Sequence, residues 1–136
     1  MAFELDGRLA ADTIPVGDLM LSRVLLMNDA RFPWAILVPR RPDLSELIDL
    51  PVAERTILME EIAALSSALR DLHAPTKINV AALGNIVAQL HVHVVARYEK
   101  DPAWPGPVFG KGPAVPYEPA AAAAAVAGLV ARLGVA

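Results

Sequence analysis

The stretch from Val52 to Leu72, near the middle of the chain, has the spacing of a long amphipathic helix. Charged residues, Glu61 among them, fall largely outside the apolar series, which recurs at intervals of four, three, four and three: Leu58, Ile62, Leu65, Leu69 and Leu72. Pro51 suits the first turn of a helix, and Pro75 disfavours helical geometry at the residue before it. Any fold open to this chain must therefore cover one face of a long helix.

Strand-like segments lie on both sides of this helix. Three precede it, separated by residues that favour turns, and a short helix is expected between the third and Pro51: Thr13–Leu19, Ser22–Met27 and Trp34–Pro39, then Asp43–Leu50. After the long helix, Lys77–Leu83 is the next expected strand, and Gly84 and Asn85 predict a turn into a fifth. A C-terminal helix is expected over Glu118–Leu133. This order predicts an α+β fold with one antiparallel sheet of about five strands.

Composition narrows the class of protein. With 136 residues, 55% hydrophobic and 20% charged, the chain is expected to form one globular domain over residues 1–136. A net charge of −3 offers no basic face for a nucleic-acid polymer. The chain has no cysteine, which excludes disulfides and thiolate metal sites. No run of 18 uncharged apolar residues precedes the C-terminal Ala tract, and the N-terminus lacks a basic region followed by an apolar stretch. We therefore expect a cytoplasmic protein that does not enter membranes.

Two of the three histidines, His91 and His93, lie two residues apart. Polar and apolar residues alternate from Gln89 to Val94, which predicts a strand with Gln89, His91 and His93 on one face. At about 3.3 Å per residue, the two Cα atoms would lie roughly 6.5–7 Å apart, so both rings could contact one ligand. An unperturbed imidazole is mostly neutral at pH 7 and has a free lone pair. The roles of nucleophile, general acid and metal ligand all stay open from the residues alone.

A zinc site is the weaker of these alternatives. Alternate histidines on a strand can chelate one ion, but a third ligand is needed. Gln89 is a poor ligand, and His73 is expected at a helix end, where it would interact with the helix dipole. We therefore expect neither a metal nor another cofactor.

The segment from Gln89 to Arg97 resembles the signature of the histidine triad family, His-φ-His-φ-His-φ-φ with φ apolar. Because two apolar residues, a small one and a basic one follow His93, this histidine matches the third of the triad, and His91 matches the central one. Gln89 then occupies the position of the first. The resemblance implies that His91 attacks the α-phosphorus of a nucleotide to form a covalent nucleotidyl-histidine, which water hydrolyses. It implies that His93 contacts the phosphate oxygens or the departing group, and that Gln89 takes the orienting role of the first histidine without becoming a cation.

The same resemblance suggests three amides as nucleotide ligands. Asn28, with Asp29 as the alternative, matches a residue that contacts the ribose hydroxyls, although either could simply cap a turn. Asn79 matches an Asn on the strand next to the histidines, and Asn85 lies where the family has an amide near the phosphate. Three apolar residues are candidates either for holding the base or for the core: Leu26, Phe32 and Ile36.

The family resemblance implies a half-barrel fold, a homodimer and a small nucleotide substrate. The expected activity is hydrolysis or nucleotidyl transfer at a phosphoanhydride or phosphoramidate bond, as in a dinucleoside polyphosphate. Gln89 motivates the alternative, a nucleotide-binding or regulatory protein without catalysis.

Overall fold

A computed structural model describes residues 2–135 as an α+β fold built on one antiparallel sheet. The sheet has the strand order β1-β2-β3-β5-β4, and its strands are β1 (Thr13–Asp18), β2 (Ser22–Met27), β3 (Trp34–Pro39), β4 (Lys77–Ala81) and β5 (Val92–Arg97). The predicted fold class is confirmed. In the described part of the chain, no helix combines the length and apolar character needed to cross a membrane.

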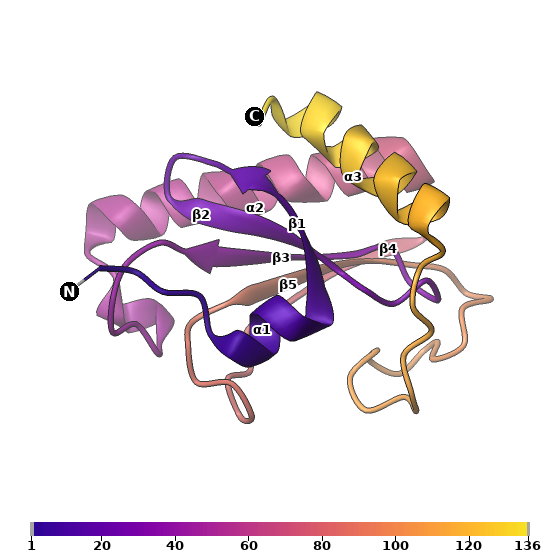
Figure 1. Ribbon diagram of the computed structural model, residues 1–136, viewed down its shortest axis with the longest axis horizontal. Coiled ribbons are helices and arrows are strands. Elements are labelled where there is room, and N and C mark those ends of the chain that lie inside the picture. Colours follow the sequence, from indigo (N-terminus) through magenta and orange to yellow (C-terminus); the bar gives the residue numbers. More distant parts are fainter. Residues whose placement is uncertain (1, 136) are drawn as a thin grey trace.

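Helices cover the two faces of the sheet unequally. α2 (Val52–His73) and α3 (Pro119–Leu133) pack on one side, whereas the short α1 (Gly7–Asp12) lies on the other (Figure 1). The expected helix between β3 and α2 is a single 3₁₀ turn, Leu47–Asp49. The α2 helix ends at His73, and the next residue, Ala74, adopts a left-handed conformation just before Pro75. The face of the sheet opposite α2 is therefore left to α1 and to loops.

Alternation along the strands separates two buried clusters. Val92 and Val94 of β5 face α2 and join its Leu58, Leu65 and Leu69. Residues of the other parity face away from α2 and pack with α1 and the loop after β5, as in the cluster of Leu9, Phe32, Trp34, Ile36, Val95 and Val108. Alternate residues of each strand belong to the two clusters. A shift of one residue in the register of any strand would therefore move its side chains from one cluster to the other.

The histidine strand begins three residues later than the sequence predicts, at Val92 instead of Gln89. The pairing of β4 with β5 is as predicted, with Ala81 opposite His93, but residues 82–91 form an extended connection and not a tight turn. Gly84 bends this connection with φ of +73°. Leu90 donates its N–H to the carbonyl of Leu44. The backbone before Val92 is thus bonded to other segments and not to the sheet.

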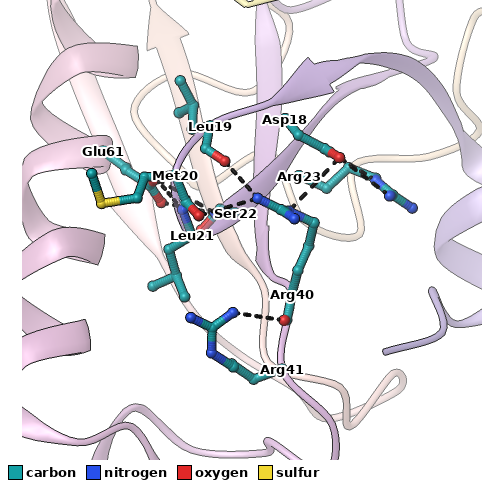
Figure 2. A network of polar contacts seen from close by, with 9 residues as sticks. All are labelled: Asp18, Leu19, Met20, Leu21, Ser22, Arg23, Arg40, Arg41 and Glu61. Carbon is teal, nitrogen blue, oxygen red and sulfur yellow. Dashed lines mark hydrogen bonds and ion pairs between the residues drawn. The ribbon is translucent and has the colours of Figure 1, made fainter. Parts of the chain in front are cut away.

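Glu61 departs from the predicted pattern of buried and exposed residues along the helix. The spacing places it outside the apolar series, yet its side chain is buried against the β1–β2 turn. Its carboxylate accepts hydrogen bonds from the N–H of Leu21 at 2.8 Å and of Ser22 at 3.1 Å (Figure 2). On the other side of this turn, the guanidinium of Arg40 donates to the carbonyl of Leu19 at 2.7 Å. Glu61 therefore satisfies backbone donors that the turn leaves unpaired.

We predict that Glu61→Ala lowers the free energy of unfolding by about 2–3 kcal/mol, because it leaves two buried N–H groups without an acceptor. Urea denaturation measures this loss. The matched control is Glu60→Ala, which removes the exposed neighbouring carboxylate and should change stability by no more than about 0.5 kcal/mol. Equal effects from the two variants would contradict the assigned role of Glu61.

Candidate functional site

A cavity of about 470 Å³ lies on the face of the sheet opposite α2 and brings His91 and His93 together. His93 faces it because Val92 and Val94, its neighbours on β5, face the α2 core. The centroids of the two imidazoles lie 4.8 Å apart, and the rings are inclined by 70°. The remaining walls come from four segments distant in sequence: Leu9 and Asp12, Met27 and Trp34, residues 83–87, and Phe109 and Gly110. One ligand in this cavity can contact both histidines, as the sequence predicts.

His91 precedes β5, and its orientation is set by its own chain. Nδ1 of His91 lies 2.6 Å from the carbonyl oxygen of Gln89. Since a carbonyl only accepts hydrogen bonds, Nδ1 must carry the proton. In the neutral ring the lone pair is then on Nε2, and the one hydrogen bond of this ring to residues 2–135 is the one at Nδ1. This is the form of histidine that can act as a nucleophile through Nε2.

His93 is enclosed by aromatic side chains. The indole Nε1 of Trp34 lies 3.0 Å from Nδ1 of His93, and the ring centroid of Phe109 lies 4.8 Å from that of His93. Burial, together with the neighbouring imidazole of His91, lowers the pKa of His93 to about 4. His93 is therefore neutral at pH 7.

The Gln89 side chain is bonded to the N-terminal segment. Its amide nitrogen donates to the carbonyl of Glu4 at 2.8 Å, and its amide oxygen accepts from the N–H of Asp6 at 2.9 Å. Asp6 in turn caps α1, which carries Leu9 and Asp12 to the cavity. The part of Gln89 that contacts His91 is its backbone carbonyl. Among residues 2–135, the amide has no hydrogen bond to either histidine.

The three predicted amides lie in different places. Asn85 is exposed and lines the histidine cavity. Asn28 lines an adjoining cavity of about 400 Å³, and its side-chain oxygen accepts from the N–H of Tyr117. Asp29, the alternative to Asn28, is buried and paired with Arg31 at 2.8 Å. Asn79 does not line the histidine cavity, and its oxygen accepts from Arg97 at 2.8 Å.

The apolar candidates for a base site belong to the core. Leu26 packs in the cluster on the α2 side, and Phe32 and Ile36 are buried in the opposite cluster. None of the three lines the histidine cavity. Its apolar walls come instead from Leu9, Met27, Leu83, Ile86, Val87 and Phe109.

Trp34 and Phe109 are site residues that the sequence analysis does not identify. Trp34 opens a predicted strand, and the pairing of Ile36 with His93 sets its indole diagonally across from the imidazole. Trp34 could be identified as a neighbour of His93 only if the order of the strands in the sheet were known. Phe109 lies in a loop after β5, and no local pattern in the sequence marks it.

A buried ion pair holds the loop that carries Phe109. The Arg97 guanidinium contacts the carboxylate of Asp101 at 2.8 Å and donates to the carbonyl of Gly106 at 2.8 Å. Burial alone would raise the pKa of Asp101, but hydrogen bonds from Arg97 and from the N–H groups of Tyr98, Ala103 and Trp104 lower it well below its usual range. Asn79, by accepting from Arg97, belongs to this network.

The third histidine lies outside the cavity. His73 ends α2, where its carbonyl accepts from the hydroxyl of Tyr98. Within residues 2–135, no group of three His, Cys, Asp or Glu side chains is arranged to hold a metal ion.

We predict that Gln89→Ala loosens the N-terminal segment, because the variant loses both hydrogen bonds to residues 4 and 6. Amide exchange of residues 4–12 should become faster, and stability should fall by about 1–2 kcal/mol. Asn85→Ala is the matched control, since this exposed amide lies in the same connection. Unchanged exchange in Gln89→Ala would contradict the assigned contact.

The lowered pKa of His93 predicts a pH dependence of stability. Between pH 6.5 and 4, the unfolded chain binds a proton at this residue while the folded protein does not, so acidification favours unfolding. Relative to His93→Gln, the wild type should lose up to about 1.4 kcal/mol of stability per pH unit in this window. Denaturation at a series of pH values measures the difference. Parallel profiles would show that His93 titrates normally.

Known proteins with the same architecture were found by sequence and by structure. The HIT domain model matches residues 8–100. A histidine triad protein from Bradyrhizobium japonicum is 44% identical, with a TM-score of 0.96, and the match covers 98% of this chain and 99% of that one. One from Sinorhizobium meliloti is 46% identical, with a TM-score of 0.94 and coverage of 96% and 97%.

A histidine triad protein from Marinobacter aquaeolei is 48% identical, with a TM-score of 0.96, and the match covers 98% of both chains. A search of curated proteins found no significant match. The family model covers well over half of the chain, and the three structures agree with it over nearly the full length. The chain therefore belongs to the histidine triad (HIT) family.

Proposed function

We propose that this protein hydrolyses or transfers nucleotides by way of a covalent nucleotidyl group on Nε2 of His91. Proteins of the HIT family generally bind nucleotides and hydrolyse or transfer them. The proposal is based on the 2.6 Å hydrogen bond from Nδ1 of His91 to the carbonyl oxygen of Gln89. This bond places the proton on Nδ1 and leaves the Nε2 lone pair free. The substrate would be a phosphoanhydride or phosphoramidate of a nucleotide, such as a dinucleoside polyphosphate.

The first step forms a bond between Nε2 and the α-phosphorus, while the bond from phosphorus to the leaving group breaks and its electron pair departs with that group. The imidazole becomes positively charged, and the Gln89 carbonyl at Nδ1 stabilises this charge. Water then attacks phosphorus and releases a proton to the solvent, and the phosphorus–nitrogen bond breaks. His91 recovers its lone pair, and the nucleotide leaves.

The hollows around His91 support a substrate with two parts. The larger cavity shares His91, Leu83 and Gly84 with a smaller one of about 240 Å³. An in-line displacement requires the nucleophile and the leaving group on opposite sides of phosphorus. In our proposal, the apolar walls hold the nucleoside, Asn85 and His93 contact the phosphate, and Asn28 reaches the ribose from the adjoining cavity. Asn79 acts only through Arg97.

A nucleotide-binding protein without catalysis is the second candidate, and the position of Gln89 favours it. The first family histidine is replaced by an amide that is bonded to residues 4 and 6. Tight nucleotide binding by the wild type, with neither turnover nor a covalent intermediate, would support this candidate over the enzyme.

We further propose a homodimer, as the family resemblance implies. The strand β4 lies at an edge of the sheet, and its Val80 is exposed. A monomer by sedimentation analysis would contradict this proposal. The cytoplasmic location stays a prediction from the sequence.

We predict that His91→Ala lowers kcat by about 10³-fold or more while nucleotide binding stays measurable, because the nucleophile is lost and the cavity walls are not. Steady-state kinetics and calorimetric titration with AMP measure the two quantities. The control is His73→Ala, which removes the histidine outside the cavity and should leave turnover near normal. Near-normal turnover by His91→Ala would overturn the assignment of the nucleophile.

The stereochemical course gives an independent test. Two in-line displacements predict net retention of configuration at phosphorus, whereas direct attack by water predicts inversion. A substrate with a chiral thiophosphate at the α-position distinguishes them. Net inversion would exclude the nucleotidyl-histidine.

A further inference from the structure

The hydrogen bond between Trp34 and His93 determines where His93 holds its proton. The indole N–H only donates, so Nδ1 of His93 must be the acceptor and Nε2 must carry the proton. Both residues are only 7% exposed, which keeps water from replacing this bond. A second proton would have to enter at Nδ1, where the lone pair already accepts from Trp34. The contact therefore favours a neutral ring that donates through Nε2.

Among residues 2–135, the neighbours of His93 offer no substitute acid. Trp34 of β3, Ala81 of β4 and Phe109 of the loop after β5 do not ionise. The titratable residues that line the cavity with His93 are His91, whose Nε2 is the proposed nucleophile, and Asp12, a carboxylate at the end of α1. The lining residues include no Lys or Arg. Gln89 cannot become a cation, and its amide is bonded to residues 4 and 6.

From this arrangement we infer that Trp34 positions His93 as a neutral donor, and that the substrate is therefore a phosphoanhydride and not a phosphoramidate. The inference rests on the proposed function and narrows its substrate class. The pKa of His93, lowered to about 4 by burial and by His91, agrees with a donor that carries no charge at pH 7.

The two substrate classes differ in whether the leaving atom must receive a proton. When a phosphoanhydride is cleaved, the electron pair stays on an oxygen of the departing phosphate, which is stable as an anion and needs only a hydrogen bond from Nε2 of His93. When a phosphoramidate is cleaved, the pair stays on nitrogen, which is too basic to leave without a proton. A neutral His93 would have to become an imidazolate to supply it. General acid catalysis contributes about 10²–10⁴-fold, so its absence should be measurable.

The test uses two substrates that differ at one atom, the p-nitrophenyl ester and the p-nitroanilide of AMP, with diadenosine tetraphosphate as the anhydride. We expect wild type to cleave the anhydride, and to favour the ester over the anilide in kcat/KM by about 10²-fold or more. Trp34→Phe removes the N–H, so His93 can be protonated on Nδ1, and the ratio of ester to anilide should fall by about tenfold. Trp104→Phe, which changes the other tryptophan, should leave the ratio unchanged.

Nitrogen NMR of the imidazoles supplies a readout that does not depend on turnover. Wild-type His93 should be neutral at pH 7 with its proton on Nε2, and its pKa should rise by about one unit in Trp34→Phe. A cationic His93 at pH 7, or a proton on Nδ1, would overturn the inference even if Trp34→Phe failed to fold. Cleavage of the anilide within tenfold of the ester, by way of the nucleotidyl-histidine, would overturn it while leaving the proposed function intact. Absence of turnover on all three substrates would contradict both.

Discussion

The 2.6 Å hydrogen bond between Nδ1 of His91 and the carbonyl of Gln89 decides which nitrogen of this imidazole can react. It depends on a stretch of chain that leaves the sheet before β5 begins and is bonded to other segments. The Gln89 amide joins this stretch to residues 4 and 6, and Leu90 joins it to Leu44. The N-terminal segment, the connection after β4 and His91, the proposed nucleophile, are thus held as one unit. The Gln89 side chain belongs to this unit through its hydrogen bonds to the backbone of residues 4 and 6, and this is the basis for proposing that it positions His91.

The two faces of the sheet have different roles. On one face, Val92 and Val94 of β5 pack against α2, which fixes the strand in the core. On the other, His93 lies under Trp34 and Phe109, and the buried pair of Arg97 and Asp101 fixes the loop that brings Phe109 there. Burying an ion pair costs desolvation, so its contribution to net stability is small, but its many hydrogen bonds specify the path of the loop. Rigid support of this kind is what a site with a defined proton position requires.

Local patterns in the sequence predict much of this structure and less of the site. Apolar residues recur with a period of two in the strands and of 3.6 in α2, because each of these elements buries one face. These periods are enough to locate the strands, the helix and the face on which His93 lies. Glu61 breaks the helical pattern because its carboxylate is buried to pair with backbone N–H groups of a turn 40 residues away. Trp34 and Phe109 reach His93 only through strand order and loop folding, which no short window encodes. The sequence predicts Gln89 on the histidine strand, but it lies before β5 and contacts residues 4 and 6.

If Nε2 of His91 forms a bond to phosphorus, the covalent intermediate can be isolated. The protein would be mixed with diadenosine tetraphosphate labelled in its adenosine, quenched in alkali and mapped by peptide mass spectrometry. We expect an adenylyl group on His91 that is stable in base and released by acid. An enzyme that turns over this substrate with no adduct, or with the adduct on His93, would contradict it.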